Sequence, residues 1–156
     1  MSTSVRARAN RILKYLKRVY PKPKSELLYD TPFQFVVAVI LSAQCTDKAV
    51  NRVTRSLFKK YKSPKDFARA KQAVFEREIN SIPFFRNKTR AILLTANDIV
   101  RTHRGKVPNT ESELVSFHGI GYKTAHVILG ELYEKWDGIP TLSALRFALG
   151  SPRIQI

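Results

Sequence analysis

The chain has 156 residues, 44% of them hydrophobic, which is enough for one folded domain and excludes a wholly disordered tail. Lysine and arginine number 28 against 12 acidic residues. The resulting formal net charge of +16 predicts a polyanionic partner, and nucleic acid is favoured over a membrane surface because no long apolar or amphipathic anchor accompanies the charge.

The N-terminal segment predicts a basic amphipathic helix over about 5–19, because apolar residues recur there at three- and four-residue spacing. Pro21 and Pro23 end it. This segment lacks the apolar run and cleavage site of a signal peptide, and no stretch of eighteen apolar residues occurs anywhere in the chain. We therefore expect a mature cytoplasmic protein that does not associate with membranes.

Thr31-Pro32 predicts the start of the next helix, since the hydroxyl caps free N–H groups and proline lacks the N–H that would go unpaired. Residues 33–41 are apolar on almost every side, which indicates a central buried helix. An alternative, that this Val-rich stretch is a strand, is disfavoured because no alternating partner strands follow.

Further helices are predicted by caps and apolar spacing. They begin after Thr46 or Asp47, at Ser63-Pro64, near Val74, at Asn87 for a long helix over 88–103 that Gly105 ends, at the capping box of Thr110 and Glu113, and at Tyr122 for a helix to about Glu134. The fold class is therefore all-α, with many short helices.

The segment 117–125, Phe-His-Gly-Ile-Gly-Tyr-Lys-Thr-Ala, joins two of these helices by a Gly-x-Gly turn. Glycines allow close approach of the backbone to a ligand, and the N–H groups of the turn and of the next helix then point at one spot that suits a phosphate. Ile120 between the glycines is expected to turn inward and hold the two helices together. A tight helix–helix turn without a ligand is the alternative.

Two separated segments carry a family resemblance. Residues 114–129 resemble the helix-hairpin-helix of the endonuclease III family of base-excision DNA glycosylases/lyases, and Leu41-Ser-Ala-Gln-Cys-Thr-Asp47 resembles that family's second signature. The resemblance covers roughly residues 10–141. It implies a multi-helical glycosylase fold and a monomer that acts on oxidised pyrimidines in damaged double-stranded DNA, in the nucleoid.

The resemblance also implies a nucleophile, Lys123, which stands where the family has its attacking lysine. Its amine would attack C1′ of a flipped-out nucleotide, forming a Schiff base that permits β-elimination. The amine must be unprotonated to attack, so we expect burial and the positive field of the helix N-terminus to favour its neutral form.

DNA contacts follow from the same alignment. Gln44 matches the residue that fills the space left by the flipped nucleotide, and Phe84 aligns with a second wedge between base steps. The other predicted DNA-binding residues lie in or near the hairpin and the long helix: Arg86, Lys88, His118, Gly119, Ile120, Gly121, Tyr122 and Thr124. His118 and His126 replace the family's usual Pro and Asn.

One departure from the family concerns its catalytic aspartate. Leu142 stands about where that aspartate belongs, and Asp137 precedes the expected position by several residues. Because leucine neither accepts a proton nor stabilises a cation, we expect impaired activity. A frameshifted or prematurely ended reading of a normal gene from about Thr141 onward would account for the change.

A second departure concerns the family's iron–sulfur lobe, which four cysteines normally hold. No cysteine follows Cys45, so we expect no cofactor and no metal site in this chain. The expected organisation is an N-terminal helix of that largely missing lobe at 1–20, a DNA-binding core at 21–137 with the helix-hairpin-helix at about 111–135, and a divergent, truncated remnant at 138–156.

Two other functions are compatible with these motifs. The first is a helix-hairpin-helix module that binds DNA without cutting it, which the missing aspartate favours. The second is a mismatch-specific glycosylase of the same superfamily, whose adenine-removing branch lacks the lysine found at position 123.

Overall fold

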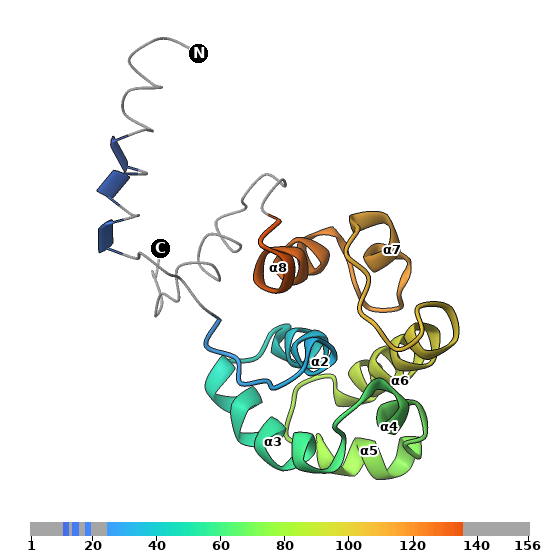
Figure 1. Cartoon of the computed structure of the whole chain (residues 1–156). Coiled ribbons are helices and arrows are strands. Elements are labelled where there is room, and N and C mark those ends of the chain that lie inside the picture. Colours follow the sequence, from blue (N-terminus) through green and yellow to red (C-terminus); the bar gives the residue numbers. More distant parts are fainter. Residues whose placement is uncertain (1–10, 13, 16–17, 20–24, 136–156) are drawn as a thin grey trace.

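A computed structural model describes residues 11–12, 14–15, 18–19 and 25–135. Residues 25–135 form a bundle of helices in which α2 lies at the centre and the others surround it (Figure 1). The helices are α2 (Pro32–Ser42), α3 (Asp47–Lys60), α4 (Pro64–Ala68), α5 (Gln72–Glu78), α6 (Phe85–Thr102), α7 (Glu111–Ser116) and α8 (Tyr122–Tyr133). No strand occurs in this part of the chain, so the predicted all-α class is confirmed.

The central position of α2 follows from its sequence. Its residues from Phe33 to Leu41 are all buried, as the apolar run predicts. Thr31 caps the helix in a capping box with Gln34, whose side-chain amide also donates to the carbonyl of Tyr61 at 3.2 Å. The one fully buried polar side chain of this helix is therefore hydrogen-bonded, which is the condition for burying it.

An aromatic cluster packs the C-terminal end of α3 and the short helices α4 and α5 against α2. The ring of Phe67 lies 5.2 Å from that of Phe33, 5.1 Å from that of Tyr61 and 6.0 Å from that of Phe75. Edge-to-face and offset pairs of this kind add to the free energy gained by burying apolar area. They make the short helices α4 and α5 parts of one core.

The predicted helix boundaries agree with the structure to within two residues except at α6. Thr46, Ser63 and Thr110 are the N-caps of α3, α4 and α7. The prediction that Asn87 caps the long helix is wrong, because α6 begins at Phe85 and its N-cap is Phe84. No side chain caps that helix, so the usual polar signal is absent from its first residue.

Other predictions fall wholly or partly on residues that the structure does not describe. Residues 11–12, 14–15 and 18–19 are helical, in agreement with the expected N-terminal helix. The rest of that helix and the segment 138–156, with Leu142, lie outside the described residues, as does Asp137. Among the helices that are described, none is both long and apolar enough to cross a lipid bilayer.

Candidate nucleic-acid interface

The hairpin between α7 and α8 is closed by its apolar residues. Ile120 is buried, as predicted, and its N–H donates to the carbonyl of Phe117 at 3.2 Å. Gly121 is the N-cap of α8 and makes no side-chain cap. The first turn of α8 therefore presents N–H groups at the positive end of the helix dipole, with no acidic side chain beside them.

Helix α6 packs against this turn and hydrogen-bonds to it. Gly119 has φ +81°, and a Cβ built on it would lie 2.6 Å from the Cβ of Ala91. One helical turn further along α6, the hydroxyl of Thr95 donates to the carbonyl of His118 at 3.2 Å. Neither Ala91 nor Thr95 was among the predicted site residues, since a small residue and a threonine in a helix carry no signal of their own.

The predicted nucleophile lies on the exposed surface directly after the hairpin. Lys123 is exposed in the first turn of α8, next to Tyr122, whose side chain is 67% exposed, and to the partly buried Thr124. The expectation that Lys123 is buried is therefore wrong. The position beside the N-terminus of α8 is as expected.

Gln44 and Phe84, the two predicted wedges, share an uncommon backbone geometry. Gln44 has φ 56° in the turn between α2 and α3, and Phe84 has φ 57° just before α6. Both side chains are exposed, and Phe84 at 61% is second only to Tyr122 among the exposed large hydrophobic residues of the described chain. Left-handed conformations in residues other than glycine cluster at functional sites.

The surroundings of Lys88 differ from those expected of a phosphate contact. Its side chain is only 7% exposed, and its Nζ donates to the carbonyls of Leu41 and Ala43, at 2.8 and 2.6 Å. The ammonium group thus faces the end of α2 and not the solvent. Arg86, by contrast, is exposed, with its guanidinium 5.0 Å from the ring centre of Phe85.

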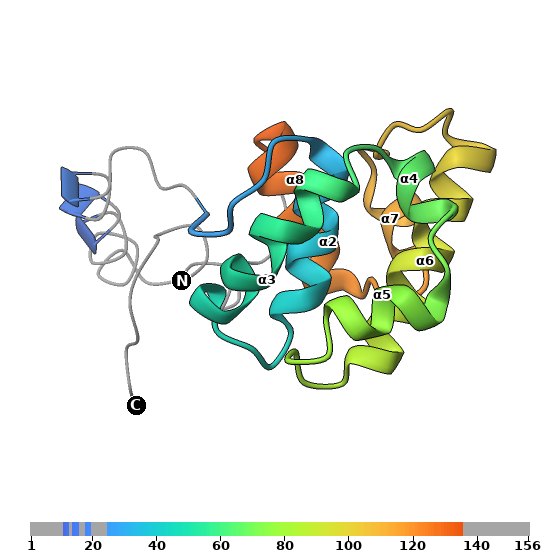
Figure 2. The ribbon, with the colours of Figure 1, turned by 90° about the horizontal axis from the view of Figure 1, so that it is seen from below.

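One face of α6 brings these features together. Phe84, Lys88, Ala91 and Thr95 follow at spacings of four, three and four residues, which places them along one side of the helix. Phe84 is at the start of this side, and Lys88 then donates to the turn that contains Gln44. Ala91 and Thr95 follow and contact the hairpin. Figure 2 shows the α2–α3 turn and the loop before α6 at the same edge of the bundle.

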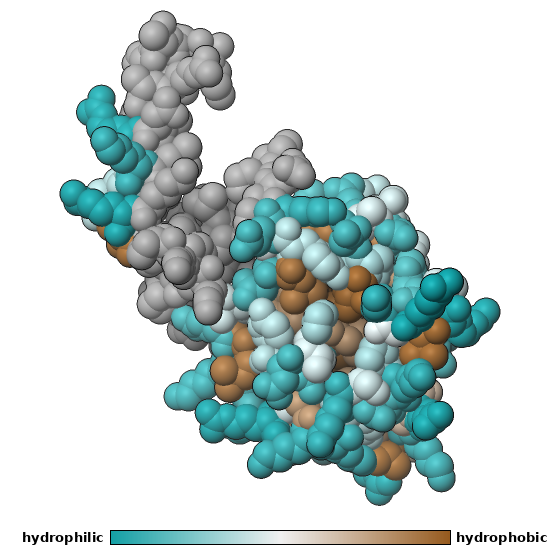
Figure 3. All heavy atoms as spheres, viewed as in Figure 1, coloured by the Kyte–Doolittle hydropathy of each residue, from teal (hydrophilic) through white to brown (hydrophobic). Residues whose placement is uncertain are grey.

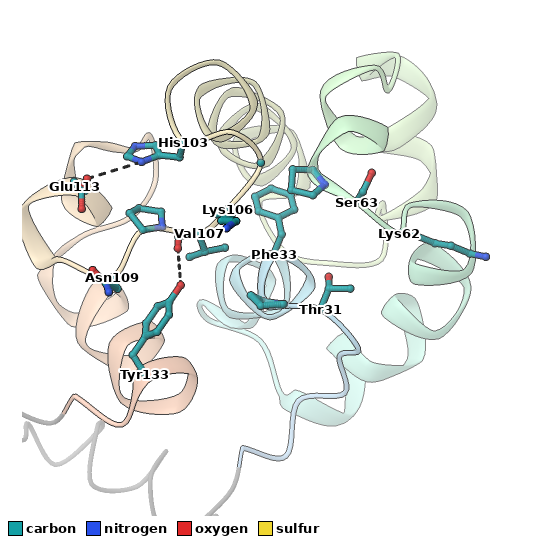
Figure 4. Close-up of a pocket in the computed structure, with 14 residues that line it drawn as sticks. Thr31, Phe33, Lys62, Ser63, His103, Lys106, Val107, Asn109, Glu113 and Tyr133 are labelled. Atoms are coloured by element: carbon teal, nitrogen blue, oxygen red, sulfur yellow. Dashed lines mark hydrogen bonds and ion pairs between the residues drawn. The ribbon is translucent and has the colours of Figure 1, made fainter.

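An open groove of about 670 Å³ lies at the opposite ends of these helices (Figure 4). It is lined by Thr31 and Phe33 at the start of α2 and by Tyr133 at the end of α8, whose hydroxyl donates to the carbonyl of Val107. Lys123 and Tyr133 are ten residues apart on one helix, or about 15 Å. The groove is therefore separate from the candidate interface.

The residues that the structure describes include no set of side chains suited to a metal ion or an iron–sulfur cluster. Among the described residues, no three side chains of His, Cys, Asp or Glu come together to hold a metal ion. Cys45, the one cysteine of the 156 residues, lies partly buried in the α2–α3 turn and cannot by itself replace four cysteine ligands.

Comparison with known proteins shows which family the chain belongs to. A family model described as HhH-GPD superfamily base excision DNA repair protein matches residues 37–146. The chain belongs to the HhH-GPD superfamily. The matched range contains the hairpin, both predicted wedges and Leu142.

Bacterial endonucleases III are among the curated proteins that resemble the chain. The protein of Synechocystis sp. is 42% identical over 136 residues, which make up 87% of this chain and 62% of that protein. The protein of Bacillus subtilis is 40% identical over 125 residues, or 80% of this chain and 55% of that protein. The chain thus spans less than two thirds of the length of these relatives.

Solved structures show the same HhH-GPD fold. A trapped endonuclease III–DNA covalent intermediate matches with a TM-score of 0.76 at 36% identity, over 86% of this chain and 62% of that one. A thermostable thymine-DNA glycosylase matches with a TM-score of 0.76 at 15% identity, which bears on the fold alone. The predicted glycosylase fold is confirmed.

Proposed function

We propose that this chain is the DNA-binding and base-flipping part of an endonuclease III-like glycosylase with abasic-site lyase activity. The observation that carries the proposal is the position of Lys123, which is exposed in the first turn of α8 directly after the glycine hairpin. No side chain caps the backbone N–H groups at the start of this helix. The similarity to a solved endonuclease III–DNA covalent intermediate supports it.

The proposed reaction begins when the hairpin binds the backbone beside a damaged nucleotide. The first-turn amides of α8 receive a phosphate, and Tyr122 and Thr124 flank it. The lone pair of the Lys123 amine attacks C1′, and the bond from C1′ to the base breaks, with the electron pair leaving on the base. The attached nitrogen loses a proton, and the C1′–O4′ bond then breaks, which leaves O4′ as a hydroxyl group and a Schiff base between Lys123 and C1′. Loss of a proton from C2′ of this Schiff base expels the 3′ phosphate and cuts the strand.

Gln44 and Phe84 would stabilise the opened duplex. The amide of Gln44 would hydrogen-bond the base left without a partner, and the ring of Phe84 would enter between neighbouring base steps. Their exposure supports these roles, since both side chains reach a partner without any change in the core. Arg86 would contact a phosphate from the start of α6.

We expect Leu142 to reduce the glycosylase activity of this chain. Without a carboxylate at that position, base removal lacks a group that accepts a proton and offsets the charge developing on the sugar. An amine alone promotes β-elimination at a site whose base is already gone. We therefore propose weak lyase activity on abasic DNA and little glycosylase activity.

The remaining proposals concern the surroundings of this core. Residues 21–137 form it, 1–20 belong to a second lobe, and the chain acts as a monomer on damaged double-stranded DNA in the nucleoid. A DNA-binding module without catalysis is the second candidate, which Leu142 favours.

The test compares two duplexes, one with thymine glycol and one with an abasic site. We expect slow, Lys123-dependent cutting of the abasic strand and almost no release of thymine glycol. Lys135→Ala changes an exposed lysine just beyond the other end of α8 and serves as the control. Efficient release of thymine glycol would contradict the role given to Leu142. A wild-type chain that neither cuts the abasic strand nor binds damaged duplex in preference to undamaged duplex would contradict the proposed function.

A further inference from the structure

Lys88 stands out among the lysines of the described residues because it is the one that is buried. Burying an ammonium group is costly, and a positive charge in the early turns of α6 also opposes that helix's dipole. Burial lowers the pKa of Lys88, an effect that the nearby Cys45 partly offsets. Something in the fold must compensate for this unfavourable position.

The compensation comes from the end of another helix. The Nζ of Lys88 donates to the carbonyls of Leu41, at 2.8 Å, and Ala43, at 2.6 Å. These carbonyls belong to the last turn of α2 and to its C-cap, where helix carbonyls lack partners and the dipole is negative. Lys88 is therefore a C-cap for α2 supplied by α6.

This cap connects the two wedge residues. Ala43 immediately precedes Gln44, and the backbone N–H of Lys88 donates to the carbonyl of Phe84 at 3.1 Å. Gln44 and Phe84 both have left-handed backbones, which are unfavourable for residues other than glycine and persist where the surroundings hold them. The bonds of Lys88 therefore link the backbone at Phe84 to the backbone beside Gln44.

We propose that Lys88 is a positioning residue that holds Gln44 and Phe84 at one spacing, so that the two side chains enter the duplex as a unit. The proposal rests on the proposed function, because it presumes that Gln44 and Phe84 meet DNA. It gives Lys88 no contact with the DNA and no part in the chemistry of Lys123.

The experiment uses the full chain and a duplex with a tetrahydrofuran abasic analogue, which the lyase reaction does not cut. The affinity ratio between this duplex and an undamaged one is measured, together with the fluorescence of 2-aminopurine opposite the analogue. Lys88→Met should reduce the ratio at least about tenfold, the effect of losing bonds to a charged group, and suppress the fluorescence change. Affinity for undamaged DNA should change little.

Two variants separate positioning from general stability. Lys88→Arg keeps the charge and the donors, and it should restore most of the ratio. Lys135→Met is the matched control, because Lys135 also donates from Nζ to a carbonyl, that of Asn109 at 2.7 Å, but in an exposed position. It should leave the ratio unchanged.

A second arm leaves Lys88 in place and so does not depend on whether Lys88→Met folds. If the wedges act as a unit, Gln44→Ala and Phe84→Ala should each remove most of the discrimination, and the double variant should lose little more. Additive losses would overturn the proposal.

The outcomes distinguish this proposal from the proposed function. If the wild-type chain discriminates and Lys88→Met discriminates equally well, the positioning role is wrong and the proposed function stands. If the wild-type chain does not prefer the analogue, the proposed function fails, and the role of Lys88 fails with it.

Discussion

Gly119 shows how a single residue sets the geometry of the hairpin. Its φ of +81° suits glycine, and the absence of a side chain lets the turn lie against Ala91, where an added Cβ would be 2.6 Å from the Cβ of that alanine. Gly121 differs, since nothing lies within 4 Å of a Cβ built there. The first glycine is thus required by the fold, and the second leaves room for a ligand.

Gly119→Ala should therefore destabilise the protein by about 1–3 kcal/mol, because the new methyl group meets Ala91 in a backbone conformation that alanine avoids. Gly121→Ala, the matched control, should change the free energy of unfolding by less than about 0.5 kcal/mol. Urea unfolding measures both. Equal effects of the two substitutions would contradict the packing described for this turn.

At the scale of helices, α6 organises the candidate interface. Its hydroxyl at Thr95 donates to the carbonyl of His118 in the hairpin, whereas the equally buried hydroxyl of Thr89 has no hydrogen-bond partner in the described structure. The same residue type in the same helix therefore has two different roles.

Substitution by valine tests this difference. Thr95→Val should lower the free energy of unfolding by about 1 kcal/mol, since it removes a hydrogen bond and keeps the shape. Thr89→Val should leave stability unchanged or raise it, because a buried hydroxyl without a partner is unfavourable. Thermal unfolding of the two variants decides the matter, and a greater loss for Thr89→Val would contradict the assignment.

Helix α8 is also tied to the segment before α2. The hydroxyl of Tyr29 donates to the carboxylate of Glu131 at 3.0 Å. Burial, aided by this bond and the nearby negative charge, raises the pKa of Tyr29 to about 12. Between pH 10 and 12 the unfolded chain loses this proton while the folded chain keeps it.

The contribution of Tyr29 to stability is thus complete below about pH 10 and declines as the pH rises toward 12. Tyr29→Phe should cost roughly 1 kcal/mol at neutral pH and flatten the alkaline decline. Unfolding by urea across this pH range is the measurement, with Tyr122→Phe, a change at an exposed tyrosine, as the control. An alkaline decline as steep in Tyr29→Phe as in the wild type would exclude the mechanism.

The sequence predicted these elements where a local signal exists. Capping threonines and serines marked the starts of α2, α3, α4 and α7, and the glycines marked the hairpin. The start of α6 was misplaced because Phe84 caps it without a polar side chain. The burial of Lys88 was not foreseen either, since it depends on two carbonyls 47 and 45 residues away in the chain.

At the scale of the whole molecule, the main features are a large positive charge and a mostly hydrophilic face. The formal net charge is +16, and hydrophilic side chains cover most of the face seen in Figure 3, with apolar patches between them. Charge of this kind favours DNA of any sequence, whereas Gln44, Phe84 and Lys123 would provide the preference for damage.

Affinity for undamaged duplex should therefore fall steeply with added salt. Arg86→Gln should reduce the slope of log K against log salt by about one, the value for one phosphate contact. Arg101→Gln, at the other end of α6 and about 22 Å away along it, should leave the slope unchanged. Binding titrations at several salt concentrations measure this. An unchanged slope in Arg86→Gln would remove Arg86 from the interface.

The most direct measurement of the central claim is borohydride trapping on abasic duplex DNA, because reduction fixes the Schiff base to the amine that formed it. We predict that the wild-type chain forms a covalent adduct slowly, that peptide mapping places the adduct on Lys123, and that Lys123→Ala forms none. An adduct that persists in Lys123→Ala, or one that maps to another lysine, would contradict the assignment of the nucleophile.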